Sequence, residues 1–412
     1  MKKKKLMVLG AGVLNSYALH EISKLDNVQL IILDGNPNSV GKGITQQFEC
    51  VDISRCVDVL EAAKRHKIDG IFSINEYGIR SAAYVSDILG LRGICMATAN
   101  AVLDKGTMRE VWQAAGIPQP EFRIILHKNE INDFAEKVGY PIVIKPVDSG
   151  GGGRGVFVIQ SARSVSQGFK VASQFLQRNN RMIIEKFVDG VETSVEVVRF
   201  KDEVYLVAFS DKIKAPYSSR VATDISYPGN FSQEVVEKIR DISDKIMRAL
   251  GIKEGIGHIE YIVTNDGSVF VVELGARAGG GHTFHPIASH VSGMNYPEWI
   301  ARFYLEEADI PKIESYRSAC YSFFYTETPG ILAEVTGLEL SRSLPQVHSV
   351  ECWRKPGDHV SVLDNSMARV GCIVTLANTR EEALSAAYSA KDKIHLNVKP
   401  DECACRKLRK IQ

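Results

Sequence analysis

The sequence predicts a multidomain protein of mixed α/β and α+β class. Three observations support this fold class. Strand-like apolar runs alternate with helical segments over the first hundred residues, a run of glycines separates two strand-like segments near residue 150, and further strands follow residue 315. A chain of 412 residues is long enough for two or three domains with large cores.

The first predicted domain covers residues 1–98 and is an open parallel sheet of the β-α-β type. Its strands are expected at "KLMVLGAG", "VQLIILD" and "IDGIFSIN". The segment "LGAGVLNS" contains part of a dinucleotide-binding fingerprint with Asp34 as the ribose acid, but Asn15 stands where the third glycine belongs. We therefore expect this sheet domain without bound NAD.

The second predicted domain covers residues 99–312, with a lid lobe at about 121–188. Residues 231–250 predict one amphipathic helix with Ser232 as its N-cap. Before this helix lies a long polar segment, residues 210–229. This segment either covers an acceptor site, where Lys212, Lys214 and Arg220 hold an acyl acid, or is a solvated loop.

The third predicted domain covers residues 313–412 and is a small α+β domain. Its strands are expected at "ACYSFFYTE", "VHSVECW" and "ARVGCIVTLA". They are followed by the helix "TREEALSAAYSAKDKI", which has a threonine cap and early carboxylates.

The composition argues against several classes of protein. The net charge is +1, from 50 basic and 49 acidic side chains, so there is no electrostatic case for nucleic acid or an anionic membrane. No apolar run reaches the roughly 18 residues of a membrane-spanning helix. The eight cysteines are scattered, which is typical of reduced thiols, and we expect a cytoplasmic protein.

The stretch "KPVDSGGGGRGVFVI" predicts a phosphate site. Glycine loses the most backbone freedom on folding, so the run Gly150–Gly153 indicates a loop that moves or approaches a ligand closely. Lys145 ends the preceding strand, and Arg154 closes the loop. Backbone amides between two cations suit a polyphosphate.

The stretch "HIEYIVTNDGSVFVVELGAR" predicts a metal site on a β-hairpin. With Asp266-Gly267 at the centre of the turn, counting outward places Glu260 opposite Glu273, whereas another loop length would offset the pair. Facing carboxylates repel each other and so indicate a cation, and hard oxygen ligands indicate Mg²⁺. Arg277 then reaches the same phosphates or a substrate carboxylate. We expect that removing either glutamate charge leaves the metal-free protein at least as stable.

These stretches resemble the ATP-grasp superfamily, and the resemblance covers most of the chain. It is carried by "LDKGTMREVWQAAGIPQP", "GYPIVIKPVDSGGGGRGV", "IIEKFVDGVETSVEV" and "HIEYIVTNDGSVFVVELGAR". The final block, with "TPGILAEVTGLE", is similar to the terminal domain of the L-amino-acid ligase and carnosine-synthase-like branch. The resemblance implies a two-lobed nucleotide-grasping domain between the two smaller domains.

The resemblance also implies site residues. The catalytic residues would be Arg277 and Lys145. The nucleotide would be bound by Lys105, Lys145, Gly151, Gly152, Gly153, Glu185, Lys186, Val188 and Glu192. The metal ligands would be Glu260 and Glu273. From their positions in the sequence, we expect substrate contacts from His282, His285, Lys212 and Arg220, with a metal cluster as the alternative for the histidines.

The activity that the resemblance implies is that of an ATP-dependent carboxylate–amine ligase. It would form an amide or peptide bond through an acylphosphate and release ADP and phosphate, with ATP and Mg²⁺ as cofactors and Mn²⁺ able to replace Mg²⁺. We expect small-molecule carboxylate and amine substrates, namely amino acids, and a homodimer.

Three other functions stay open. One is a biotin-carboxylase-like or purine-pathway carboxylating enzyme, and another is an NAD-dependent oxidoreductase. The third is a nucleotide-binding protein without turnover, which is suggested by Gly275, because many ATP-grasp proteins carry a metal-binding Asn at this position.

Overall fold

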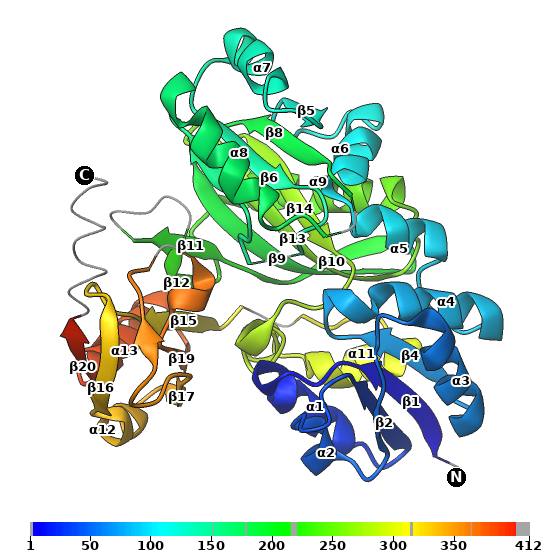
Figure 1. Ribbon diagram of the computed structural model, residues 1–412. Helices are drawn as coiled ribbons and strands as arrows, with labels where there is room; N and C mark the ends of the chain where they lie inside the picture. Colours follow the sequence, from blue (N-terminus) through cyan, green and yellow to red (C-terminus); the bar gives the residue numbers. More distant parts are fainter. Residues whose placement is uncertain are drawn as a thin grey trace. The chain divides into compact units, whose positions relative to one another are not determined.

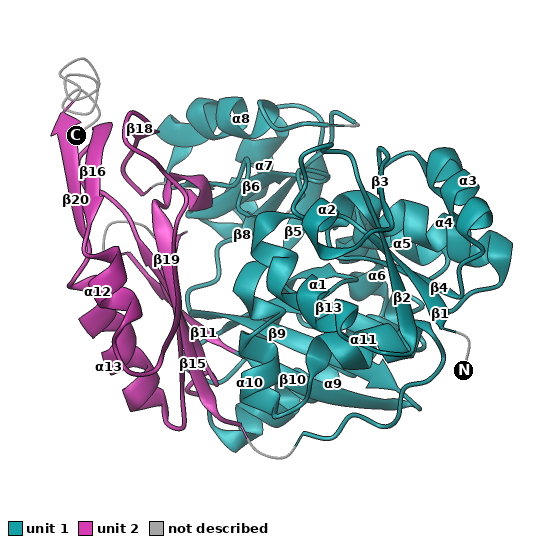
Figure 2. Cartoon of the chain, turned by 90° about the horizontal axis from the view of Figure 1, so that it is seen from below, with its two compact units in different colours: residues 1–209, 231–314 teal, residues 210–230, 315–412 magenta. Residues whose placement is uncertain are grey.

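The computed structural model describes residues 3–150, 152–177, 179–215, 221–313, 316–363 and 365–400 (Figure 1). The chain divides into two compact units (Figure 2). The first unit contains residues 1–209 and 231–314, and the second contains residues 210–230 and 315–412. The finer division into three domains stays a prediction.

The first unit begins with the predicted open parallel sheet. The strands pair in parallel in the order β3-β2-β1-β4 and comprise β1 (Lys4–Leu9), β2 (Val28–Asp34), β3 (Phe48–Cys50) and β4 (Gly70–Ser73). The helices of this part are α1 (Ser16–Ser23), α2 (Gly41–Ile44), α3 (Cys56–His66) and α4 (Ile79–Leu89). The apolar runs of β1, β2 and β4 are buried, as is usual for a parallel sheet covered by helices.

The Asp34 carboxylate serves its own loop. It accepts the backbone N–H groups of Ala11 at 2.6 Å and Asn36 at 2.8 Å. This contact gives the acid a structural role in the βαβ turn.

A second sheet is antiparallel and has the strand order β5-β8-β6-β7. Its strands are β5 (Phe122–Ile125), β6 (Ile142–Pro146), β7 (Phe157–Ile159) and β8 (Met182–Lys186). The neighbouring helices are α5 (Met96–Val102), α6 (Lys105–Ala114), α7 (Glu130–Val138) and α8 (Val165–Ser173). Apolar side chains of α7 and α8 form one core with this sheet.

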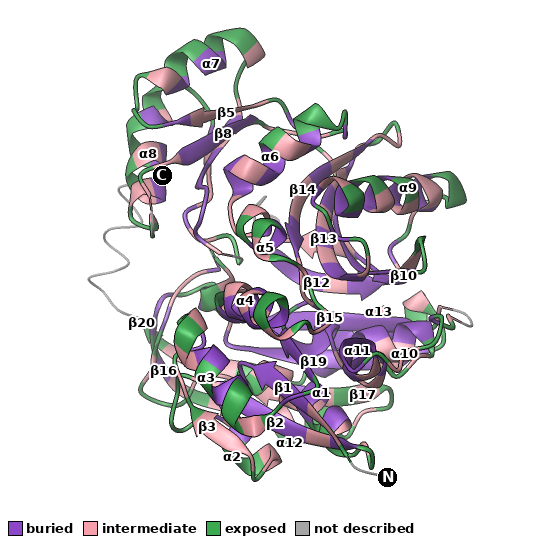
Figure 3. Ribbon diagram, turned by 90° about the vertical axis from the view of Figure 1, so that its right-hand side faces the viewer, coloured by how far each residue is buried: buried purple, intermediate pink, exposed green. Residues whose placement is uncertain are grey.

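The third sheet has the order β10-β9-β13-β14 and is also antiparallel. Its strands are β9 (Val191–Phe200), β10 (Glu203–Phe209), β13 (Gly255–Val263) and β14 (Val269–Gly275). The predicted amphipathic helix is α9 (Gln233–Ala249), which begins at its N-cap Ser232 and presents both a buried and an exposed side (Figure 3). Ser243 of α9 and Tyr261 of β13 share a buried hydrogen bond of 2.6 Å. The unit continues with α10 (Ile287–Ser292) and α11 (Tyr296–Tyr304).

The second unit contains a sheet of order β11-β12-β15-β19-β17 and a smaller one of order β18-β16-β20. The strands are β11 (Asp211–Lys214), β12 (Ala222–Tyr227), β15 (Ser318–Phe324), β16 (Gly330–Thr336), β17 (Val347–Cys352), β18 (His359–Val360), β19 (Gly371–Ala377) and β20 (His395–Pro400). The helices are α12 (Leu338–Arg342) and α13 (Arg380–Lys391), and Thr379 and Glu382 form a capping box on α13.

The described part of segment 210–229 is not the solvated loop that was one of its two predicted forms. Its described part forms β11 and β12, which join the sheet of the second unit. Its polar side chains are used inside that unit. Arg380 donates to both carboxylate oxygens of Asp211 at 2.8 and 2.7 Å, and Ser322 lies 2.5 Å from Asp224. These partners come from more than 90 residues away, so the segment resembles a loop when read alone.

The predicted fold class, α/β together with α+β, is confirmed by this arrangement. None of the helices in the described ranges combines the length and apolar character that a membrane span requires. The cysteines that the structure describes are free thiols.

Candidate active site

One face of the sheet β10-β9-β13-β14 carries the polar side chains of the candidate site. Side chains alternate along β13, and those of the other face are buried together with α9. The site face of β13 contains His258 and Glu260. The register with β9 places Glu196 beside His258 and Ser194 beside Glu260, while Glu273 comes from β14. The acids of three strands therefore lie on one surface.

Glu260 and Glu273 are cross-strand partners, as predicted, but by a different route. Backbone pairing of Thr264 with Ser268 encloses a three-residue turn, which shifts the strands by one residue relative to the predicted two-residue turn. A β-bulge at Val272 shifts the pairing back by one residue. The two offsets cancel, so the carboxylates face each other.

Lys105 lies beside the carboxylate pair. Its ammonium is 3.0 Å from Glu273 Oε1 and donates to the Gly150 carbonyl at 3.3 Å. Burial alone would lower the pKa of Lys105, but the surrounding carboxylates, Glu273 first, outweigh burial and raise it. The lysine therefore stays charged between the predicted metal ligands and the start of the glycine loop.

A buried ionic triad lies on the neighbouring sheet. Lys145 of β6 donates to Glu185 Oε2 of β8 at 2.8 Å, and Arg109 of α6 reaches Oε1 at 2.7 and 2.8 Å. All three side chains are almost completely buried. Burial raises the pKa of Glu185, but Arg109 and Lys145 outweigh it and lower the pKa to about 2.

The triad holds one carboxylate between two cations. Burial lowers the pKa of Lys145, and Arg109 adds to this effect, although Glu185 opposes it. A buried excess of positive charge is costly and is relieved by an anion. The backbone N–H of Lys105 donates to the Val147 carbonyl at 2.8 Å, which joins the start of α6 to the end of β6. Both predicted lysines therefore belong to one cationic region.

The glycine loop begins against charged side chains. Left-handed φ angles of +68, +81, +72 and +72° occur at Gly150, Gly152, Gly153 and Gly155. A Cβ at Gly150 would lie 2.6 Å from Arg154 Nη2 and 2.9 Å from Glu76 Oε2. Glycine is required there for both its conformation and its close approach. Gly151, also predicted to bind nucleotide, lies outside the described residues.

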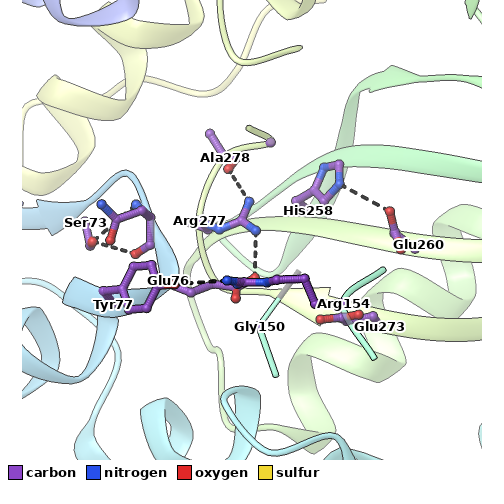
Figure 4. Close-up of polar contacts among 12 residues, drawn as sticks. Ser73, Glu76, Tyr77, Gly150, Arg154, His258, Glu260, Glu273, Arg277 and Ala278 are labelled. Carbon is purple, nitrogen blue, oxygen red and sulfur yellow. Dashed lines mark hydrogen bonds and ion pairs between the residues drawn. The ribbon is translucent and has the colours of Figure 1, made fainter. Parts of the chain in front are cut away.

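Arg277 connects the metal hairpin with the N-terminal sheet. Its guanidinium donates to Glu76 Oε1 at 2.8 Å and to the Ala278 carbonyl at 2.9 Å (Figure 4). Glu76 begins the short helix η2 (Glu76–Gly78) after β4. The next residue, Tyr77, accepts a hydrogen bond from Arg154 of the glycine loop at 3.3 Å. Opposite charges thus meet beside the loop.

His258 and Glu196 form a second charged pair on the site face. His258 Nδ1 lies 2.5 Å from Glu196 Oε1, and Glu196 Oε2 accepts the N–H of Gly279 at 2.9 Å. The other ring nitrogen, Nε2, is 3.9 Å from Glu260 Oε1. Figure 4 shows the imidazole directed toward Glu260.

The residues predicted to contact the base and ribose lie where the chain passes from β8 of the second sheet to β9 of the third sheet. Lys186 ends β8 and lies 3.9 Å from Glu121, while Val188 follows in the connection to β9. Glu192 lies on β9 opposite Ile262, on the same strand face as Glu196. Contacts of these residues, and of the triad's Glu185, with a nucleotide stay predictions.

The predicted substrate residues belong to both units of the chain. His282 is buried in η4 (Gly281–Thr283) with its ring centroid 5.1 Å from that of Tyr17, and His285 lies 2.9 Å from Ser289 Oγ. Lys212 lies on β11 and belongs to the second unit, unlike the histidines. Arg220 lies outside the described residues.

Sequence reasoning missed four residues of this site. They are Glu76, Arg109, Glu196 and His258. Two of them could have been found from the sequence. Strand alternation places Glu196 on the same face of β9 as Glu192, and His258 on the same face of β13 as Glu260. No pattern in the sequence indicates Glu76 or Arg109, because each joins the site through a partner that lies far away in the sequence.

The donor atoms fit a nucleotide with a divalent cation. Glu260 and Glu273 offer facing carboxylate oxygens of the kind that Mg²⁺ prefers. The lysines, with Arg109, offer buried cations for phosphates. The geometry can therefore hold a polyphosphate between a metal pair and a cationic region.

Comparison with known proteins agrees with this geometry. Residues 110–290 match the ATP-grasp domain family, and residues 322–399 match the L-amino acid ligase C-terminal domain 2 family. The chain contains an ATP-grasp domain followed by an L-amino acid ligase C-terminal domain. Together the two matches place it among the carboxylate–amine ligases, enzymes that form carbon–nitrogen bonds and in general use ATP with Mg²⁺. The predicted family and class of enzyme are confirmed.

Individual relatives of this ATP-grasp chain are distant. An uncharacterized protein of Sinorhizobium fredii is 25% identical over 340 residues, covering 82% of this chain and 70% of that protein. The L-arginine-specific L-amino acid ligase of Bacillus subtilis is 26% identical over 230 residues, covering 54% of each chain. The crystal structure of L-amino acid ligase from Bacillus licheniformis superposes with a TM-score of 0.83 at 19% identity, covering 97% of this chain and 100% of that one. The structural likeness establishes the fold.

Proposed function

We propose that the protein joins the carboxylate of one amino acid to the amine of another and converts ATP to ADP and phosphate. The observation that carries this proposal is the pair of Arg277 and Glu76 beside Gly150. An α-amino acid carries the same two charges. Its carboxylate fits Arg277, and its ammonium fits Glu76, so the substrate replaces the contact that the two side chains make with each other.

The reaction follows from this placement. A carboxylate is a poor acyl donor because its leaving group would be oxide, and transfer of a phosphoryl group converts it into a good one. Arg277 orients the carboxylate, and Lys105 and Lys145 neutralise the phosphates. Glu260 and Glu273 hold the divalent cation, which supplies further charge neutralisation at the transferred group. The glycine loop covers the acylphosphate and excludes water until the amine attacks.

The remaining assignments belong to the same proposal. Gly151, Gly152 and Gly153 contribute backbone amides to the phosphates. The base and ribose are held by Glu185, Lys186, Val188 and Glu192. The second substrate is held by His282, His285, Lys212 and Arg220. The protein acts as a cytoplasmic homodimer with ATP and Mg²⁺, which Mn²⁺ can replace, and has the three domains given above.

Release of ADP across a matrix of amino acid pairs tests the proposal, with mass spectrometry of the products. An acid labelled with ¹⁸O should transfer one labelled oxygen to phosphate, because the carboxylate oxygen that attacks ATP leaves with the phosphoryl group. Glu76→Gln should raise KM for the amino acid and leave ATP affinity unchanged. Turnover that needs bicarbonate, or phosphate without label, would instead favour a carboxylating enzyme or plain ATP hydrolysis.

A second candidate is a nucleotide-binding protein without turnover. Gly275 favours it, because this position opposite His258 offers no side-chain ligand to a metal. Cation-dependent ATP binding without phosphate release over the whole matrix would support this candidate.

A further inference from the structure

His258 is held in one orientation by the residues behind it. Glu196, which is 1% exposed, accepts from the imidazole Nδ1 and from the backbone N–H of Gly279. A Cβ at Gly279 would collide with both the carboxylate and the ring, so the chain can make this contact only with glycine. A carboxylate that accepts from Nδ1 selects the tautomer whose Nε2 carries a lone pair.

The lone pair faces the predicted metal ligands. Nε2 lies 3.9 Å from Glu260 Oε1, which is too long for a hydrogen bond. Two donor atoms that bind one octahedral ion at about 2.1 Å each are separated by about 3 Å when adjacent and by about 4.2 Å when opposite. The observed 3.9 Å lies between these two values, so one ion can reach both the nitrogen and the oxygen after a small rotation of either side chain.

The position of His258 in the sheet agrees with this spacing. It lies two residues before Glu260 on the same face of β13, and its cross-strand partner Gly275 lies two residues after Glu273 on β14. Gly275 itself offers no ligand at this place, and a Cβ there would lie 3.5 Å from Cζ of the Arg277 guanidinium.

We propose that His258 Nε2 is a third protein ligand of the cation held by Glu260 and Glu273, and that Glu196 is the positioning residue for this ligand. The inference rests on the proposed function, from which it takes the cation between the two carboxylates. Carboxylate-supported histidines are common metal ligands. Imidazole favours Mn²⁺ or Co²⁺ relative to Mg²⁺ more than carboxylate oxygens do. The site should therefore prefer Mn²⁺ more strongly than a site built from oxygen ligands alone.

Pulsed electron paramagnetic resonance of bound Mn²⁺ tests the ligand directly. The protein with natural nitrogen is loaded with Mn²⁺ and ¹⁵N-labelled ADP, so any ¹⁴N coupled to the manganese comes from the protein. We expect imidazole ¹⁴N modulation in the wild type and its loss in His258→Ala. The exposed His127→Ala variant is the matched control and should retain it.

Metal affinity gives a second readout, which is available even if His258→Ala does not fold. Glu196→Gln should weaken Mn²⁺ binding to the ADP complex by about ten- to a hundredfold, as for other partners of metal-bound histidines. His258→Asn, which offers an oxygen, should lower the ratio of Mn²⁺ to Mg²⁺ affinity.

The outcomes separate the two proposals. Mn²⁺ bound with ADP but without ¹⁴N modulation, or modulation that persists in His258→Ala, would overturn the histidine ligand and leave the ligase proposal standing. A wild-type protein that binds no Mn²⁺ with ADP would overturn both.

Discussion

Glu260→Gln and Glu273→Gln remove the same charge from two facing positions, yet the structure predicts different effects on stability without metal. The sequence alone predicts that both variants are at least as stable as the wild type. The contact of Lys105 with Glu273 changes this expectation, because the buried ammonium loses its carboxylate only in Glu273→Gln.

The magnitudes follow from burial. The side chains of Lys105 and Glu273 are 8% and 21% exposed, and removing one partner of a buried pair costs about 3 to 5 kcal/mol. The lower value applies, because the ammonium retains the Gly150 carbonyl. Relief of the repulsion with Glu260 returns up to about 1 kcal/mol, so Glu273→Gln should lower the free energy of unfolding by about 2 kcal/mol. Glu260→Gln should raise it by up to about 1 kcal/mol.

Urea unfolding in chelator, followed by circular dichroism, measures the difference. Glu237→Gln on α9 is the control, and it should change the midpoint little because the ion pair of Glu237 with Arg240 is largely solvated. Carboxylates raise the pKa of Lys105 above its ordinary 10.5. The difference in free energy of unfolding between the wild type and Glu273→Gln should therefore be complete below pH 10.5, and it should be lost as the pH rises through the raised pKa. Equal stability of the two glutamine variants at pH 8 would refute this reasoning.

Three further predictions concern the rest of the site. Glu185→Gln leaves the cations Arg109 and Lys145 buried without a carboxylate and should lower the free energy of unfolding by about 3 to 5 kcal/mol. Because the pKa of Glu185 is lowered from 4.5 to about 2, this difference should be complete above pH 4.5 and vanish in urea titrations as pH falls toward 2. Lys145→Ala should weaken ATP binding at least tenfold by calorimetry but keep its circular dichroism spectrum, since Arg109 still neutralises Glu185; wild-type affinity would contradict the phosphate role. Gly279→Ala should displace Glu196 and weaken Mn²⁺ binding by titration, and an unchanged affinity would mean that this close contact does not matter to the metal.

Local patterns predicted much of the fold. The alternating apolar runs of β1, β2 and β4 indicated the parallel sheet, and Ser232 marked the start of α9 because a cap is read from neighbouring residues. The strands β11 and β12 were missed because their polar side chains gain partners from β15 and α13, which lie far away in the sequence.

Pairs that are distant in sequence limited the prediction of the site. Glu185 was assigned to a nucleotide from its motif, but its place in a triad depends on Arg109, 76 residues earlier. Likewise Arg277 meets Glu76 across 201 residues, which no periodicity reveals. The facing pair Glu260 and Glu273 was predicted correctly only because the turn and the bulge shift the register by equal and opposite amounts.

The bulge at Val272 also determines which changes in chain length the hairpin tolerates. Removing one residue from the turn, or Val272 alone, should end the cross-strand pairing of Glu260 with Glu273, because a register slip of one residue exchanges the two faces of a strand. Removing both should restore the alignment with a shorter, regular hairpin. The turn and the bulge therefore act as compensating insertions, and homologues that differ by one residue in the turn should differ by one residue in β14 as well.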